Sequence, residues 1–242
     1  MSGDKRLIVA LDVHSMEKVQ QLVEMLDDSV SYYKVGMELF YSVGSQVITY
    51  LRQQNKDIFL DLKLYDIPNT VGRGLASLTE LGATMLNVHA SGGFAMMQTA
   101  AAAVKEKASQ MQRERPKLIA VTVLTSMSTV EWSALGYDVD LSQQVVHLAQ
   151  LAQKAGLDGV VASPQEAAQI RAVCGSEFII VTPGIRPCGA AINDQSRIAT
   201  PAGALQNGAH HLVVGRPITA AMNPQKAVEE ILLEMREDHE RN

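Results

Sequence analysis

Cysteine is almost absent from this chain: only Cys174 and Cys188 occur among its 242 residues. Two cysteines are too few for a disulfide framework, and no histidine lies beside them at the spacing of a metal site. This usage is typical of a protein in a reducing compartment. We therefore expect a cytoplasmic protein.

Long hydrophobic runs and blocks of like charge are also lacking. The first apolar run, residues 7–11, ends at Asp12, so it resembles neither a signal peptide nor a membrane span. Lysine and arginine are scattered, and the formal net charge of -5 gives no long-range attraction to phosphate backbones. We expect no membrane and no nucleic-acid partner, although local cations could bind a phosphorylated small molecule.

The sequence does contain a regular alternation of short apolar runs and longer amphipathic segments. No linker interrupts it, and 47% hydrophobic residues suffice for a full core, so we predict a single domain over residues 1–242. Strands are expected at residues 6–13, 32–37, 58–66, 84–89, 118–125, 159–162, 178–182 and 211–214. Helical periodicity covers residues 16–26, 43–54, 70–81, 94–107, 142–155, 164–173 and 224–236, with a short helix near 202–206.

This order of elements predicts an α/β fold. Strand–helix units of about thirty residues favour a parallel sheet closed into a (β/α)8 TIM barrel, because parallel strands need crossover helices. The alternative is an open doubly wound sheet. That fold would normally carry a glycine-rich phosphate turn after its first strand, where this chain reads LDVHS at residues 11–15. The barrel is favoured.

The third expected strand ends in three ionisable residues, Asp61, Lys63 and Asp66. Side chains alternate along a strand, so Asp61 and Lys63 share the inward face while their leucine neighbours face the helices. Burial disfavours both charges, but a carboxylate beside the lysine keeps it protonated, as a proton donor requires. The alternative is an ion pair that only caps the strand.

Other polar residues fall at the same end of neighbouring strands. Asp12 ends the first strand, Lys34 lies on the second, and Thr125 ends the fifth. Active sites of such barrels lie at the carboxyl ends of the strands. Each residue by itself is an ordinary strand-end residue, but charges at the same end of three adjacent strands are hard to explain by packing.

The seventh and eighth strands are each followed by glycine and arginine, in the motifs TPGIR (182–186) and VGR (214–216). Barrels often hold phosphate after these strands, through backbone N–H groups and an arginine. We therefore predict a phosphate site made by Arg216 and the Gly215 amide. Residues 187–200, which include Gln195, are expected to form a mobile cover over the site. A solvated arginine and an ordinary surface loop are the alternatives.

These motifs together resemble the orotidine 5′-phosphate decarboxylase family over nearly the whole chain. The strongest shared element is FLDLKLYDIPNT at residues 59–70. Supporting elements are ALD (10–12), KVG (34–36), LTS (124–126), TPGIR (182–186) and VGR (214–216). No position that the family's chemistry requires departs from its pattern.

The resemblance implies decarboxylation of orotidine 5′-monophosphate to UMP and CO2, the last step of de novo pyrimidine nucleotide synthesis, without a cofactor. It implies that Lys63 protonates the vinyl carbanion at C6 and that Asp61 faces the departing carboxylate. Lys34 and Asp66 would extend this array of alternating charges. The further roles implied are ribose binding by Asp12 and Lys34, pyrimidine recognition by Thr125, and phosphate binding by Gln195, Gly215 and Arg216, with Arg186 beside them.

The resemblance also implies a homodimer, in which Asp66, Ile67 and Thr70 enter the site of the neighbouring subunit. Metal-dependent relatives such as 3-keto-L-gulonate 6-phosphate decarboxylase share the D-x-K-x-x-D run but are expected to carry an acidic ligand on strand two. Lys34 stands there instead, so we expect no metal. The remaining alternative is a catalytically silent barrel that binds a nucleotide. Turnover in the presence of a chelator would distinguish a metal-independent decarboxylase from both a metal-dependent relative and a silent nucleotide-binding barrel.

Overall fold

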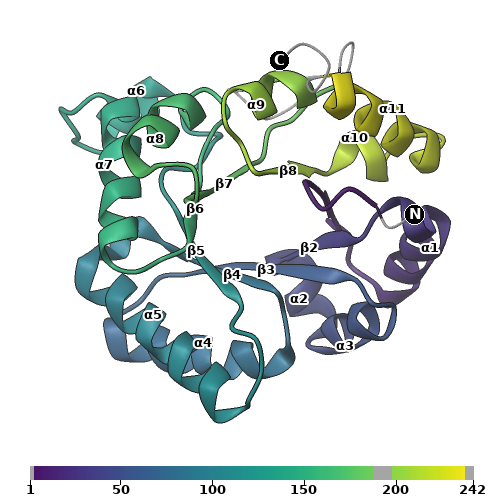
Figure 1. Ribbon diagram of the computed structural model, residues 1–242, viewed down its shortest axis with the longest axis horizontal. Coiled ribbons are helices and arrows are strands. Elements are labelled where there is room, and N and C mark those ends of the chain that lie inside the picture. Colours follow the sequence, from purple (N-terminus) through teal and green to yellow (C-terminus); the bar gives the residue numbers. More distant parts are fainter. Residues whose placement is uncertain (1–2, 188–197, 238–242) are drawn as a thin grey trace.

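The structure, a computed structural model, describes residues 3–187 and 198–237. Each strand pairs in parallel with the next, and the last pairs with the first, which closes the barrel (Figure 1). The strands are β1 (Leu7–Ala10), β2 (Tyr32–Gly36), β3 (Asp57–Leu64), β4 (Met85–His89), β5 (Lys117–Val121), β6 (Gly159–Val161), β7 (Ile179–Thr182) and β8 (His211–Val214). This confirms the predicted (β/α)8 barrel.

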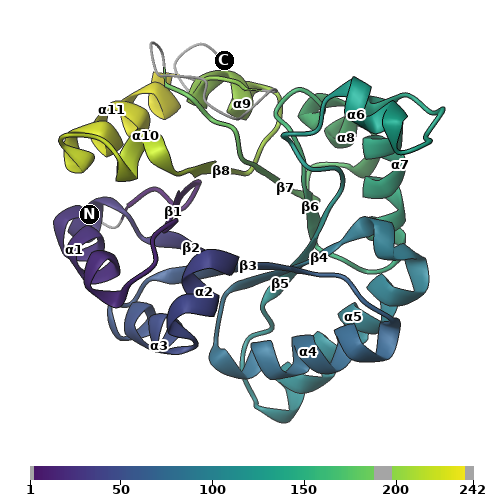
Figure 2. The ribbon, with the colours of Figure 1, turned by 180° about the vertical axis from the view of Figure 1, so that it is seen from behind.

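Helices surround this ring of strands, as the view from behind also shows (Figure 2). They are α1 (Met16–Leu26), η1 (Asp27–Ser29), α2 (Met37–Val43), α3 (Gln46–Gln53), α4 (Pro68–Leu81), η2 (Ala90–Gly92), α5 (Gly93–Gln110), α6 (Thr129–Ala134), α7 (Leu141–Lys154), α8 (Ala167–Cys174), α9 (Pro201–Gln206), α10 (Arg216–Thr219) and α11 (Pro224–Glu237). Among these described helices, none has the length and apolar character needed to cross a membrane.

The helix expected over residues 43–54 is wrong at its start, because residue 43 ends a preceding helix and the expected helix begins only after Gly44 and Ser45. Helix α2 ends at Val43, and α3 begins at Gln46. Gly44 adopts φ = +67° between them, and its N–H donates to the Phe40 carbonyl. A left-handed residue of this kind ends a helix, and glycine adopts it without strain. The short helices α2, α6 and α10 were not expected, since few residues carry their periodicity.

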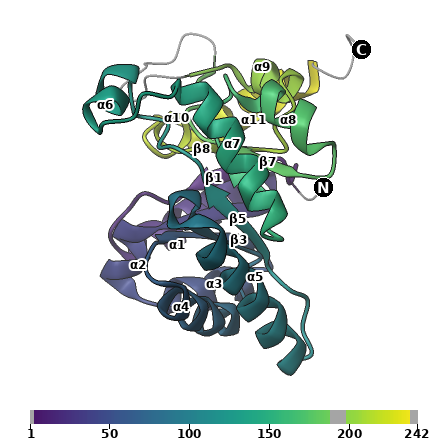
Figure 3. The ribbon, with the colours of Figure 1, turned by 90° about the vertical axis from the view of Figure 1, so that its left-hand side faces the viewer.

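The strands separate two hydrophobic clusters, because their side chains alternate between the barrel interior and the helices. Side chains that face outward join the large cluster packed against the helices. The interior is filled by Ile8, Ala10, Tyr32, Phe59, Met85, Ile119, Val181 and Val213. On β3, Phe59 belongs to this interior set, so Asp61 and Lys63 follow it on the inward face, as predicted. Figure 3 shows α2 and α6 toward one end of the barrel and the N-terminus toward the other.

Candidate active site

A cavity of about 220 Å³ lies at the carboxyl ends of the strands, the end predicted to hold the site. It is lined by Lys34, Phe59, Asp61, Lys63, Leu124, Thr125, Ser126, Val161, Pro183 and Val213. Phe59 and Val213 belong to the interior cluster, so the cavity has an apolar base. Ionisable groups on β2 and β3 face the same space, where they can act on a bound molecule.

Four charged residues form a continuous row of contacts beside this cavity. The Lys63 ammonium donates to Asp61 Oδ1 over 2.7 Å. On the other side of the carboxylate, Lys34 Nζ lies 3.5 Å from Asp61 Oδ2 and donates to Asp12 Oδ1 over 3.0 Å. The structure therefore brings together residues on β2, on β3 and just after β1 whose charges alternate in sign.

The row is held in its ionised form by its own charges. Burial by itself would raise the pKa of the Asp61 carboxyl, but the ammonium groups of Lys34 and Lys63 outweigh burial and lower it. Burial likewise opposes the charge on Lys34, while the carboxylates of Asp61 and Asp12 raise its pKa above the ordinary value. Asp61 and Lys34 consequently stay charged at neutral pH.

Two glycines leave room for this row. A Cβ atom on Gly36 would lie 3.0 Å from Lys34 Nζ, which is closer than ordinary contacts allow. A Cβ atom on Gly215 would lie 3.3 Å from Asp12 Oδ2. The glycines of the KVG and VGR motifs therefore let two charged groups pass close to the backbone.

Lys63 has an unusual backbone as well as a functional side chain. Its φ of +52° lies in the left-handed region, which is uncommon for a residue other than glycine. The pairing of β3 with β4 shifts register between Leu60 and Leu64, so Lys63 lies in an irregular part of the strand. Its backbone N–H donates to a side chain, Asn87 Oδ1, over 2.8 Å.

Asn87, on β4, was not among the predicted site residues. It is only 1% exposed, and its Nδ2 donates to Asp61 Oδ1 over 2.7 Å. Met85, two residues earlier, faces the barrel interior. An amide at an inward position of a buried parallel strand is the sequence signal that would have identified it.

The predicted phosphate residues lie beyond β7 and β8. Arg186 is buried, and its Nη1 donates to the Ile185 carbonyl over 2.9 Å. Burial, and then the nearby guanidinium of Arg216, lower the pKa of Arg186. Arg216 begins α10 and is exposed. Two guanidinium groups that repel each other favour an anion between them. The remaining predicted phosphate residue, Gln195, lies outside the described residues, as does most of the loop 187–200.

The three residues expected to serve a neighbouring subunit lie on the exposed segment that follows β3. Asp66, Ile67 and Thr70 are all exposed, Ile67 to 66%. The Asp66 carboxylate accepts the N–H of Ile67 over 2.6 Å. Among the described residues, no ion pair joins Asp66 to a lysine of its own chain. The structure therefore does not bring Asp66 into the row formed by Asp61 and Lys63.

His89 borders the site at the end of β4. Its ring centroid lies 5.8 Å from that of Tyr65, and burial, then the Lys63 ammonium, lower the pKa of the imidazole. Within residues 3–187 and 198–237, no group of three or more His, Cys, Asp or Glu side chains is arranged to hold a metal ion.

Known proteins resemble this chain along most of its length. Residues 5–231 match the family described as orotidine 5′-phosphate decarboxylase / HUMPS family. The chain is 51% identical over 231 residues to the orotidine 5′-phosphate decarboxylase of Carboxydothermus hydrogenoformans, covering 96% of each. It is 46% identical to the protein of that name from Pasteurella multocida, covering 93% of this chain and 95% of the relative. A crystal structure of orotidine 5′-phosphate decarboxylase from Lactobacillus acidophilus matches with a TM-score of 0.84 at 42% identity, covering 96% of this chain and 99% of that one.

Proposed function

The chain belongs to the orotidine 5′-phosphate decarboxylase / HUMPS family, and we infer that it decarboxylates orotidine 5′-monophosphate to UMP and CO2. This is the decarboxylation step of pyrimidine nucleotide biosynthesis. The observation that carries the choice of substrate is the place of Lys34. Its ammonium contacts Asp12 Oδ1 at 3.0 Å and Asp61 Oδ2 at 3.5 Å, so a lysine bridges these two carboxylates. A Mg²⁺-dependent sugar-phosphate decarboxylase would need such oxygens as metal ligands.

The difficulty of this reaction is the vinyl carbanion that remains at C6 when CO2 leaves, because no conjugated group takes up its electron pair. Stabilisation must come from charges on the protein. We assign Lys63 the role of stabilising the carbanion and then protonating C6. Its ammonium lines the cavity and is held by Asp61 Oδ1 at 2.7 Å.

Asp61 has two roles in this mechanism. Its carboxylate faces the carboxylate of the substrate, and the repulsion between them is relieved as CO2 departs. It also fixes the ammonium of Lys63 beside C6. Because the pKa of Asp61 is lowered by the two lysines, both roles are available at neutral pH.

The rest of the substrate extends from this row toward β7 and β8. Asp12 and Lys34 are suited to bind the ribose hydroxyls, because their carboxylate and ammonium offer acceptors and donors at the cavity edge. Thr125, which lines the cavity, is assigned to the amide edge of the pyrimidine. Arg186, Arg216 and the Gly215 amide would bind the phosphate. Gln195 is proposed as a further phosphate ligand.

Phosphate binding contributes to the reaction at a distance. Enzymes lower barriers by roughly 8 to 23 kcal/mol, and a carbanion without an electron sink needs the upper part of that range. One ion pair does not supply so much. Binding energy from the remote phosphate can instead hold the pyrimidine against the row of charges, which lowers the barrier rather than only tightening binding.

We further propose that the working enzyme is a homodimer in which Asp66, Ile67 and Thr70 complete the site of the partner. The exposure of all three residues supports this, since a large apolar side chain such as Ile67 gains by being covered. Asp66 would then add a carboxylate next to the Lys63 of the other subunit.

Mixed dimers test this arrangement. Lys63→Ala and Asp66→Asn are each expected to be inactive alone, because every site then lacks one residue. Mixing the two after dissociation and reassociation should restore about a quarter of the parent activity, since half of the dimers would contain one intact site. If both residues belonged to one subunit's site, the mixed dimers would stay inactive.

A cytoplasmic location is also part of the proposal. Cys174 on α8 is a buried free thiol, and reducing compartments keep such thiols unpaired. The substrate carries charges that cross a bilayer poorly, so the enzyme should work where orotidine 5′-monophosphate is made. Fractionation of cells should place the activity in the cytosolic fraction.

The direct test follows the ultraviolet absorbance of orotidine 5′-monophosphate with purified protein and EDTA. Rapid conversion to UMP is expected, and Lys63→Ala serves as the inactive control. If the folded protein leaves this substrate unchanged but acts on a sugar phosphate once Mg²⁺ is added, the role given to Lys34 is wrong.

A further inference from the structure

Asn87 connects the two residues to which the mechanism gives the chemistry. It lies on β4, is 1% exposed and does not line the cavity. Its Oδ1 accepts the backbone N–H of Lys63 over 2.8 Å, and its Nδ2 donates to Asp61 Oδ1 over 2.7 Å. One buried amide therefore contacts the main chain of the proton donor and the side chain of its partner.

The backbone of Lys63 needs such a contact. A left-handed φ in a residue other than glycine is energetically unfavourable and persists where the surrounding contacts hold it. The register shift between Leu60 and Leu64 interrupts the regular pairing of β3 with β4 at this point. There the Asn87 amide oxygen accepts the Lys63 N–H. This side-chain hydrogen bond replaces the backbone hydrogen bond that regular strand pairing would provide.

The other half of the amide acts on the carboxylate. Asp61 Oδ1 accepts from both the Lys63 ammonium and Asn87 Nδ2, each at 2.7 Å. Two donors on one oxygen fix the plane of the carboxylate. The second oxygen, Oδ2, is left toward Lys34 at 3.5 Å.

We propose that Asn87 is a positioning residue for the decarboxylation, because its amide locks the Lys63 backbone and the Asp61 carboxylate into one geometry. This rests on the proposed function of Lys63 as proton donor. The requirement is specific to an amide of this length. It must accept from one group and donate to the other at the same time, which neither a carboxylate nor an aliphatic side chain does.

Two variants and one matched control test the proposal. Asn87→Ala removes both hydrogen bonds, and Asn87→Asp keeps the shape and the acceptor but replaces the donor with a charge beside Asp61. The control is Thr84→Val, at the other end of the same strand pair. Thr84 Oγ1 also contacts β3, since it accepts the Ile58 N–H at 2.9 Å and donates to the Ile58 carbonyl at 3.0 Å.

We expect kcat of Asn87→Ala to fall by about 10²-fold while KM changes by less than about threefold, because the ammonium is misplaced but the phosphate contacts remain. Asn87→Asp should lose rate most strongly at high pH, because the new carboxyl is then ionised, cannot donate to Asp61 and repels its carboxylate. As pH falls, the new carboxyl takes up a proton before Asp61 does, because Asp61 lies between two lysines, so kcat should partly recover relative to the parent. Thr84→Val should lower the unfolding midpoint without changing kcat.

The outcomes separate this proposal from the function on which it rests. If the parent protein converts orotidine 5′-monophosphate but folded Asn87 variants keep kcat within threefold, Asn87 has no positioning role. A rise in KM alone, or an Asn87→Asp variant whose kcat does not recover relative to the parent as pH falls, would also overturn it. If the parent itself fails to decarboxylate this substrate, the proposed function fails first and the role of Asn87 with it. Should Asn87→Ala not fold, the near-isosteric Asn87→Asp decides the question.

Discussion

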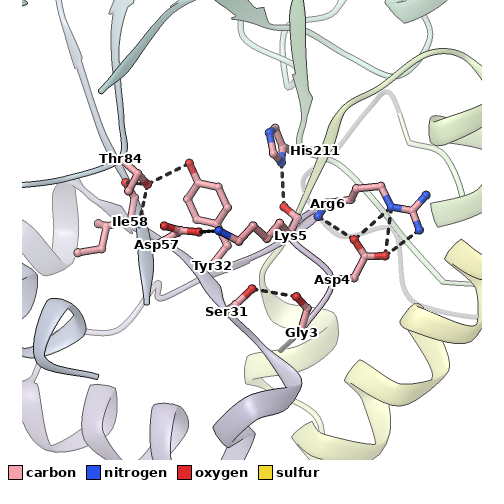
Figure 4. Close-up of polar contacts among 10 residues, drawn as sticks. All are labelled: Gly3, Asp4, Lys5, Arg6, Ser31, Tyr32, Asp57, Ile58, Thr84 and His211. Atoms are coloured by element: carbon pink, nitrogen blue, oxygen red, sulfur yellow. Dashed lines mark hydrogen bonds and ion pairs between the residues drawn. The ribbon is translucent and has the colours of Figure 1, made fainter. Parts of the chain in front are cut away.

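The two ends of the barrel carry similar charged residues but connect them differently. A cavity of about 390 Å³ lies at the amino-terminal end, and it is larger than the cavity of about 220 Å³ beside the row of charges. At the amino-terminal end, the carboxylates of Asp57 and Asp158 have separate cationic partners. Lys5 Nζ lies 2.8 Å from Asp57 (Figure 4), and Arg115 makes two bonds of 2.8 and 2.6 Å to Asp158.

Figure 4 shows how this end is closed by hydrogen bonds of the N-terminal segment and neighbouring strands. The His211 ring donates to the Lys5 carbonyl at 2.9 Å, and Thr84 contacts the Tyr32 hydroxyl at 3.3 Å. At the carboxyl end, in contrast, Asp61 is shared by two lysines, and one of them has a left-handed backbone. Cavity size does not identify the site, whereas a buried carboxylate shared by two lysines does.

The sharpest way to test this contrast is Lys63→Ala. We expect decarboxylation to fall by about 10⁴-fold or more, because both carbanion stabilisation and protonation are lost. UMP should still bind, since the phosphate and ribose contacts remain. Single-turnover kinetics and calorimetric UMP titration measure the two properties, and substantial remaining activity would remove Lys63 from the proton-donor role.

A smaller effect is expected from Arg216→Ala. Loss of charge-assisted bonds to the phosphate should lower kcat/KM by about 10²-fold or more, although Arg216 lies far from C6. Arg113→Ala is the matched control, because Arg113 is an exposed arginine that lines the amino-terminal cavity. An unchanged kcat/KM for Arg216→Ala, or an equal loss for Arg113→Ala, would contradict the placement of the phosphate.

Asp158→Ala at the amino-terminal end is expected to lower stability and leave catalysis unchanged, in contrast to Arg216→Ala. Asp158 accepts two bonds from Arg115 and the N–H of Leu118 at 2.7 Å, so its loss should lower the free energy of unfolding by about 2 kcal/mol. kcat should not change, because within the described part of the chain no ion pair or hydrogen bond links Asp158 to the row of charges. Urea unfolding and steady-state kinetics on the same preparation check both statements.

The smallest expected effect is a decline in folding stability as the pH falls. Burial lowers the pKa of the His211 imidazole from its ordinary 6.5, although its bond to Lys5 opposes this. As pH falls below 6.5, the unfolded chain therefore takes up the proton first, so stability that is complete above pH 6.5 declines below it.

The pKa values of the His89 and His210 imidazoles are lowered as well, so these residues add to the same loss of stability. The lowered pKa values of Asp4 and Asp61 reduce stability only when the pH falls below 3.8. Denaturant unfolding at pH 7.5 and 5.5 should show the decline. His211→Gln, which keeps an N–H donor for Lys5 but does not titrate there, should show a shallower one. An equally steep decline in that variant would exclude His211 as a source.

Much of the fold and part of the site could be predicted because their signals are local. The alternation of apolar runs and amphipathic segments predicted all eight strands, since each pattern depends on neighbouring residues. The two-residue period of β3 predicted that Asp61 and Lys63 face inward together. The split at Gly44 was missed, because a helical period continues across a glycine whose φ the sequence does not reveal.

The sequence by itself determined which side chains face the barrel interior and which strand ends carry charge, because both follow from spacing along one strand. Only the tertiary structure decided how these groups meet. The contact between Asn87 and Asp61 joins residues 26 positions apart, and it depends on the register of β3 against β4. The left-handed φ of Lys63 likewise arises where that register shifts. Local periodicity carries no information about either, because register is set when whole strands pack into a closed barrel.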